Sequence, residues 1–315
     1  MPLRFLFKII MVAAIAGAGY LLYSTLSQYS LDEILEALNS IPFSHLTAAL
    51  GFAACSYLCL ACSDALAVRY AGGSLPFHQT TLASFTALSI GHNVGVAALS
   101  SGAVRYRFYS RWGLSMQQVA KIIVFCGVTV ALGISTVGAL GFYLRPEDAA
   151  RMTGFGADAI SLAGILCLAF PVLYLILAAT VRKPLHFRKW NFAMPKLPIA
   201  AGQVAVGTAN FSFVAACLHQ ILSGITEAGY IKVAAASITA NIAAIASHVP
   251  GGIGVLEATI AYIIPGAASV AAVIAYRVIY YFVPLGIGLP LLLASEFYYR
   301  GEADDPELEK NAQKT

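Results

Sequence analysis

Apolar runs of about 20 residues recur along the whole chain and constrain its fold more than any other feature. A run of that length is long enough to cross the hydrocarbon core of a bilayer as a helix. Inside lipid every backbone N–H and C=O group needs a partner within the protein, so only helices and closed barrels can span the membrane. The sequence therefore predicts an all-α, polytopic membrane protein.

The composition agrees with this reading and excludes several classes of protein. Hydrophobic residues make up 59% of the chain and charged residues only 11%, whereas a soluble domain has about a quarter charged. The net charge of +4 comes without a basic stripe interleaved with aromatics, so no nucleic-acid partner is expected. Cys55, Cys59 and Cys62 share one helical face, but we interpret them as packing residues, and we expect no metal or other cofactor.

Two stretches interrupt the apolar pattern and resemble each other. The first begins Ser89-Ile-Gly-His-Asn93 and breaks at residues 100–102, and the second begins Ser237-Ile-Thr-Ala-Asn241 and breaks at residues 250–252. Roughly 148 residues separate them, nearly half of the chain. Broken helices at corresponding positions of two halves are typical of transporters with internal repeats. We therefore predict one transmembrane domain, residues 1–300, with pseudo-repeats at about 1–150 and 151–300.

The distribution of basic residues predicts which segments cross. If segments 80–99 and 234–264 enter and return on the same side, fifteen of the nineteen Lys and Arg residues fall on the cytoplasmic side, together with both termini. If every apolar segment crosses instead, eight basic residues fall on the wrong side. The first arrangement makes the two halves inverted, and we expect a disordered cytoplasmic tail at 301–315. Six full spans then remain: 8–26, 45–68, 116–144, 159–181, 199–222 and 270–297.

The two breaks predict a polar site within the membrane. Irregular backbone at membrane depth persists only where it is buried in protein or lines a wet cavity, so Gly251 and Gly252 are expected at such a cavity. Helix N-termini exposed there carry partial positive charge and suit an anion such as a lipid phosphate. Arg105, Arg107 and Arg111 would grip that phosphate by bidentate contacts, or would act only as anchors at the inner interface.

Polar residues inside the spans are the other site candidates. Glu257 and Arg277 are expected to form an intramembrane ion pair, which would be either functional or purely structural. Asn93 and Asn241 would either hydrogen-bond across the pseudo-symmetry or contact a headgroup. The sequence has no phosphate-binding loop, no nucleophile elbow and no zinc-protease motif, so an enzyme is not expected.

Three segments carry a resemblance to a known family: the stretch from Asn93 to Arg107, Gly113-Leu-Ser115, and Pro250-Gly-Gly-Ile-Gly-Val-Leu-Glu257. The chain resembles the lysylphosphatidylglycerol synthase transmembrane-region family, which includes the flippase part of the multiple peptide resistance factor. The resemblance implies a multi-pass protein of the bacterial inner membrane that moves aminoacylated or other anionic phospholipids between leaflets. The chain ends soon after its last span, without a soluble aminoacyl-transferase domain, so we do not expect it to make lysyl-phosphatidylglycerol itself.

Three functional hypotheses follow. The first is a phospholipid flippase or scramblase, with phospholipids as partners and movement either downhill or coupled to an ion through Glu257. The second is a non-transporting, lipid-binding membrane partner in envelope synthesis, and the third is a small-solute transporter. A homo-oligomer remains open in each case.

Overall fold

The computed structural model describes residues 30–303 except 95–96, 145, 147–155, 182–184 and 188–189. The predicted first span, 8–26, and most of the predicted tail lie outside the described residues. The predicted all-α fold is confirmed, with one short hairpin of strands β1 (Leu185–Phe187) and β2 (Trp190–Phe192) as an addition. The helices are α2 (Leu31–Asn39), α3 (Phe43–Tyr70), α4 (Phe77–Val94), α5 (Ala97–Arg111), α6 (Met116–Leu144), α8 (Ala157–Thr180), α9 (Leu197–Ser223), α10 (Tyr230–Ser247), η1 (Pro250–Gly252), α11 (Val255–Ile263), α12 (Ala267–Arg277), η2 (Val278–Phe282) and α13 (Val283–Ala303).

Six helical segments among the described residues are long and apolar enough to cross a membrane. They are Phe43–Tyr70, Met116–Leu144, Asp158–Thr180, Leu197–Ser223, Tyr230–Ser247 and Ala267–Tyr298. Five of them coincide with predicted spans. The sixth is α10, which has 18 residues and belongs to the segment that we predicted to turn back within the bilayer. Re-entry of α4–α5 and of α10–α11 stays a prediction.

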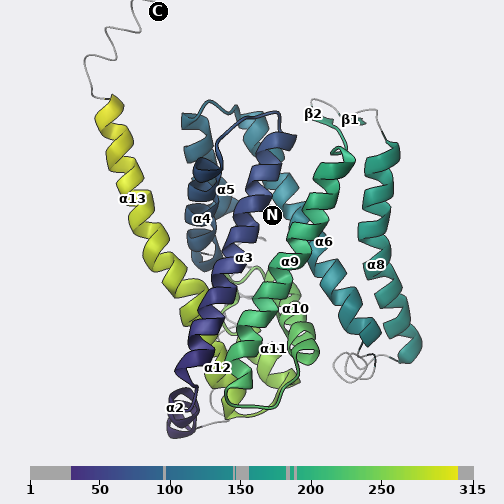
Figure 1. Ribbon diagram of the computed structural model, residues 1–315, viewed down its shortest axis with the longest axis vertical. Coiled ribbons are helices and arrows are strands. Elements are labelled where there is room, and N and C mark those ends of the chain that lie inside the picture. The colour runs from purple at the N-terminus through teal and green to yellow at the C-terminus, as the bar shows by residue number, and fades with distance from the viewer. Residues whose placement is uncertain are drawn as a thin grey trace, which may run out of the picture.

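Helices α3 and α9 form the antiparallel centre of the bundle and run through most of its height (Figure 1). Phe52 stacks on Phe213 with ring centroids 6.1 Å apart. One turn further along α3, the Ser56 hydroxyl donates to Oδ1 of Asn210 at 2.7 Å. The partner number falls along α9 as the residue number rises along α3, as an antiparallel pair requires.

Two helical hairpins pack against this centre from opposite ends. Helix α4 packs on α5, and α10 packs on α11. In Figure 1 the α4–α5 pair occupies the upper half of the bundle and the α10–α11 pair the lower half. The end of α4 contacts η1, the turn of the second hairpin, so the two hairpins meet near the middle of the molecule.

The crossing of α6 and α9 depends on glycine. A Cβ atom on Gly133 would lie 2.3 Å from the carbonyl oxygen of Gly207. A Cβ atom on Gly207 would lie 2.5 Å from the carbonyl oxygen of Thr129. The two backbones therefore touch, which is how small residues let helices associate where lipid removes the hydrophobic drive.

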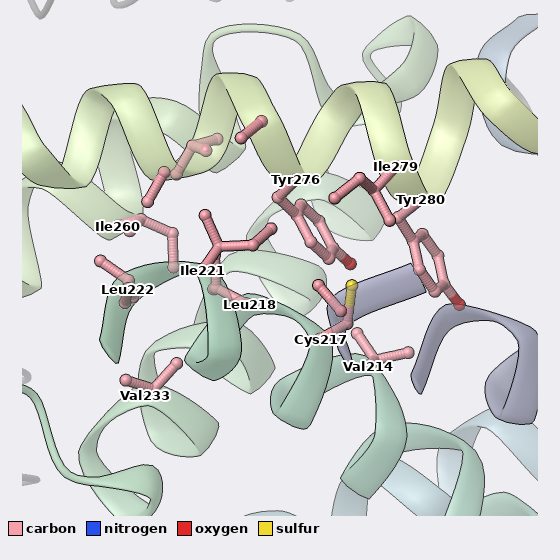
Figure 2. Close-up of a cluster of buried hydrophobic side chains, with 14 of the residues drawn as sticks. Val214, Cys217, Leu218, Ile221, Leu222, Val233, Ile260, Tyr276, Ile279 and Tyr280 are labelled. Carbon is pink, nitrogen blue, oxygen red and sulfur yellow. The ribbon is translucent and has the colours of Figure 1, made fainter. Parts of the chain in front are cut away.

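A buried apolar cluster joins the second half together (Figure 2). In this view Tyr276 and Tyr280 point from α12 and η2 toward Val214 and Cys217 of α9. Leu218 and residues of α3, α10 and α11 complete the cluster. Its packing fixes α11 and α12 against the central helix and so holds the second hairpin in place.

The last predicted span is one bent helical unit rather than a straight rod. Helix α12 passes through the π-helical turn η2 into α13, which contains Pro290. Helix α13 packs along α4, and it lies at the edge of the bundle in Figure 1. A π turn inside an α-helix widens the backbone locally and often marks a functional position.

Candidate functional site where the two hairpins meet

The turn of the second hairpin is built from residues in left-handed conformation. Helix α10 ends at Ser247 and is followed by the cap residue His248, whose φ is 55°. Gly251 and Gly252 have φ of 60°, and Gly254 has φ of 81°. A Cβ atom on Gly252 would also lie 2.8 Å from that of Ala244. The chain reverses direction within a few residues because glycine adopts these angles without steric cost.

Arg277 of α12 holds this turn. Its Nη1 donates to the carbonyl oxygen of Gly251 and its Nη2 to that of Gly252, each at 3.0 Å. Its Nε also donates to Oε1 of Glu257, and its Nη2 lies 3.0 Å from Oε2 of the same carboxylate. The backbone N–H of Gly254 donates to that Oε2 at 2.8 Å. The ion pair that the sequence predicted between Glu257 and Arg277 is thus present, and it fastens the turn to α12.

The end of α4 faces the same turn. A Cβ atom on Gly251 would lie 3.5 Å and 3.6 Å from the carbonyl oxygens of His92 and Asn93. The Asn93 amide donates to the carbonyl oxygen of Tyr281 at 3.3 Å, which joins α4 to η2. Carbonyl groups from both hairpins therefore converge at one place inside the bundle.

The two predicted asparagines have matching geometry. The Asn93 side chain donates to the carbonyl oxygen of Ser89 at 2.8 Å, and that of Asn241 donates to the carbonyl oxygen of Ser237 at 2.8 Å. Each bond spans four residues of its own helix. Among the described side chains the two asparagines do not bond to each other, and headgroup contact remains their other predicted role.

Polar and aromatic side chains surround the junction. The Tyr57 hydroxyl lies 3.4 Å from Nδ1 of His92 and donates to the carbonyl oxygen of Tyr280 at 3.3 Å. The Ser56 hydroxyl lies 2.8 Å from that of Tyr280 and also binds Asn210 of α9. This network joins α3, α4, α9 and η2 around the meeting point.

A second buried ion pair fixes the first hairpin. Arg105 of α5 donates from Nε and Nη2 to the two carboxylate oxygens of Asp64, at 2.9 Å and 2.8 Å. Its Nη1 donates to Ser101 at 3.1 Å, and the Tyr109 hydroxyl donates to Asp64 at 3.1 Å. The side chains are 5% and 0% exposed, so this pair is shielded from water. Our sequence reasoning did not find Asp64, although a carboxylate in the middle of an apolar span is itself a sign of a buried partner.

The two outer arginines of α5 bind one carboxylate of α13. Glu296 accepts from Nη2 of Arg107 at 2.6 Å and from Nη1 and Nη2 of Arg111 at 2.9 Å and 2.7 Å. Arg107 is more than half exposed, unlike Arg105 two residues earlier. The structure therefore separates Arg105 from Arg107 and Arg111, which the sequence grouped. Arg105 points at a fully buried carboxylate, and the other two point at a carboxylate that is 14% exposed.

A known protein family matches most of the chain. The family described as "Lysylphosphatidylglycerol synthase TM region" matches residues 9–288, which include both hairpins and both buried ion pairs. The chain belongs to this family.

Two relatives of this family member are similar over most of their length. "Uncharacterized protein slr0712" from Synechocystis sp. (strain ATCC 27184 / PCC 6803 / Kazusa) is 31% identical over 269 residues, which cover 84% of this chain and 83% of the relative. "Inner membrane protein YbhN" from Escherichia coli (strain K12) is 27% identical over 272 residues, which cover 84% of each chain. The family resemblance read from the motifs is confirmed, and the chain is a polytopic membrane protein.

The predicted first break at residues 100–102 is wrong, because these residues lie inside α5, which is helical from Ala97 to Arg111. The predicted cavity at the breaks stays a prediction. A surface pocket of about 360 Å³ lies elsewhere, between α2 and the start of α12, and is lined by Glu33, Glu36, Ala37, Ser40 and Ala267. At the junction the structure gives carbonyl oxygens, a histidine, tyrosine hydroxyls and the Glu257–Arg277 ion pair. Such groups can hydrogen-bond a polar headgroup at a depth where lipid offers it no partner.

Proposed function

We propose that this protein moves phospholipids between the leaflets of the bacterial inner membrane, as a flippase or scramblase and without enzymatic chemistry. The observation that carries the proposal is the meeting of two helical hairpins, end to end, inside the helical bundle. Polar backbone collected at that depth offers a path to a headgroup while the acyl chains stay in lipid. Family membership supports a lipid substrate.

An inverted repeat, part of the same proposal, is supported by the pattern of helix contacts. The contacts α3–α4, α4–α5, α5–α6 and α3–α6 of the first half correspond to α9–α10, α10–α11, α11–α12 and α9–α12 of the second. Between the halves, α6–α10 corresponds to α13–α4. In such repeats the substrate site lies near the midplane, where the halves meet, and access alternates as one half moves against the other.

Glu257 is the residue that we propose for coupling. Its carboxylate holds both the guanidinium of Arg277 and the N–H of Gly254. Protonation would weaken both bonds, because they depend on the negative charge. Arg277 would then be held less firmly in place. Its hydrogen bonds to the carbonyl oxygens of Gly251 and Gly252, which anchor the turn, would weaken. A proton gradient could drive transport in this way, while an uncoupled protein would move lipid only downhill.

The test is leaflet transfer by the purified protein. Proteoliposomes would carry fluorescent phosphatidylglycerol, and the accessible fraction would be followed by chemical quenching from outside. We expect faster transfer with protein than without it, and a loss of transfer in Glu257→Gln. Glu227→Gln, the same change in an exposed loop carboxylate, is the matched control. Thermal unfolding of each variant separates lost transfer from lost fold.

Failure of the wild-type protein to speed transfer would refute the proposal. Retention of phosphatidylglycerol without transfer would then favour the lipid-binding partner in envelope synthesis. A protein that neither binds nor transfers lipid would favour the small-solute transporter.

The proposed orientation, with both termini in the cytoplasm, predicts that a cysteine introduced by Arg107→Cys reacts with reagents added from the cytoplasmic side.

A further inference from the structure

We propose that Arg107 and Arg111 form a binding site for the phosphate of an anionic phospholipid, and that Glu296 occupies this site until the lipid arrives. The inference rests on the proposed function for its meaning in transport, but the binding itself can be measured without any transfer. The proposed lipid-recognition site lies at the edge of the bundle and is distinct from the buried pair of Arg105 and Asp64.

The first argument is the position of the two arginines on α5. They lie four residues apart, one turn of the helix, so their positive charges face each other and are unfavourable without an anion between them. Glu296 supplies that anion, and its Oε2 accepts from both guanidinium groups, at 2.6 Å and 2.7 Å. A phosphodiester has the same charge as a carboxylate and presents two oxygens to the same planar donors.

The second argument is access. The side chains of Arg107, Arg111 and Glu296 are 53%, 27% and 14% exposed. The guanidinium of Arg107 is therefore open to an approaching anion, which can compete with the carboxylate for it. By contrast, Arg105 is 5% exposed and offers no comparable surface to a lipid.

The third argument is what Glu296 connects. Helix α13 continues from the π turn η2 and packs along α4, and its far end is joined to α5 through this carboxylate. A lipid phosphate that takes the two arginines would release that end of α13. Arrival of the headgroup would thereby loosen the edge of the bundle next to the first hairpin.

Lipid retention by the full-length protein tests the proposal. Protein in nanodiscs of phosphatidylcholine would be loaded with phosphatidylglycerol, and bound lipids would be counted by native mass spectrometry. We expect Glu296→Gln to bind phosphatidylglycerol roughly three- to tenfold more tightly than the wild type, because the competing anion is gone. Glu227→Gln should not change binding. The double variant Arg107→Ala/Arg111→Ala should lose the preference for phosphatidylglycerol, whereas Arg69→Ala should keep it.

Inorganic phosphate forms a second arm that distinguishes the source of the ligand. Displacement of phosphatidylglycerol by millimolar phosphate would assign the site to the free ion and overturn a lipid as its ligand. Unchanged or weaker lipid binding in Glu296→Gln than in Glu227→Gln would overturn the site itself. If these variants behave as expected but the wild type moves no lipid, the binding site stands and the proposed function fails. If the wild type transfers lipid normally but Glu296→Gln binds phosphatidylglycerol no more tightly than the wild type, only the proposed binding site is refuted.

Discussion

Replacing Asp64 with Asn tests how the first hairpin is held. The substitution preserves shape but removes the charge opposite a guanidinium that is 5% exposed. Arginine cannot lose its proton in a protein, so Arg105 would remain a buried cation without a counter-ion. Breaking a buried pair in this way costs about 3–5 kcal/mol. We therefore expect Asp64→Asn to lower the free energy of unfolding by that amount.

Removing the arginine instead of the carboxylate should lower the free energy of unfolding by less. In Arg105→Met the remaining Asp64 carboxyl can take up a proton and become neutral, and it keeps its hydrogen bond from Tyr109. The double variant Asp64→Asn/Arg105→Met contains no buried charge at this position. We expect it to recover at least about 2 kcal/mol relative to the sum of the two single effects, which is roughly a 30-fold change in the unfolding equilibrium.

The assay is unfolding of the purified protein in mixed micelles of increasing sodium dodecyl sulfate, followed by far-ultraviolet circular dichroism. Additive single effects, or an Asp64→Asn protein within 0.5 kcal/mol of the wild type, would refute the buried pair. Leaflet transfer by the double variant then separates two roles of Arg105. If the double variant recovers both stability and transfer, Arg105 serves only to hold the first hairpin in place. If it recovers stability but not transfer, Arg105 has the phosphate contact that the sequence suggested.

Three further substitutions probe the helix crossing, the turn and the network. Gly133→Ala should destabilise the protein by about 1–3 kcal/mol because its Cβ would meet a backbone carbonyl of α9 at 2.3 Å. Gly127→Ala in the same helix meets nothing within 4 Å and should be neutral or slightly stabilising. Thermal unfolding distinguishes the two variants. Gly252→Ala should cost at least about 1–2 kcal/mol from its φ of 60° alone, and equal stability to the wild type would show that the turn is built differently. Tyr280→Phe should cost about 0.5–1.5 kcal/mol through loss of the 2.8 Å bond to Ser56, and an unchanged unfolding curve would argue against that network.

The sequence predicted the helices well because lipid removes most alternatives. The predicted span 116–144 matches α6 to the residue and the other four spans agree within three residues, since length and apolarity are nearly sufficient where backbone groups must be satisfied within each segment. The break before α11 was also readable, because Pro250 and the following glycines favour a turn over a helix. The π turn η2 was not predicted, because no proline or glycine in residues 278–282 signals it.

The site was only partly predictable for a different reason. Glu257 and Arg277 lie 20 residues apart in neighbouring segments, so pairing two lone intramembrane charges was a short step. Asp64 and Arg105 lie 41 residues apart and on helices that a one-dimensional pattern does not bring together. Glu296 lies 189 residues from Arg107, so its role depends entirely on how α13 returns to α4.

The two buried pairs have opposite polarity, and this bears on why they exist. The hairpin arm α5 carries an arginine that binds a carboxylate of α3, whereas the arm α11 carries a carboxylate that binds an arginine of α12. Apolar side chains of similar size would often stabilise a protein as much or more, so stability alone does not explain either pair. Each pair does fix one hairpin arm to one helix at a defined height, since guanidinium and carboxylate meet in a single planar geometry. We infer that the pairs set the positions of the two hairpin ends relative to each other.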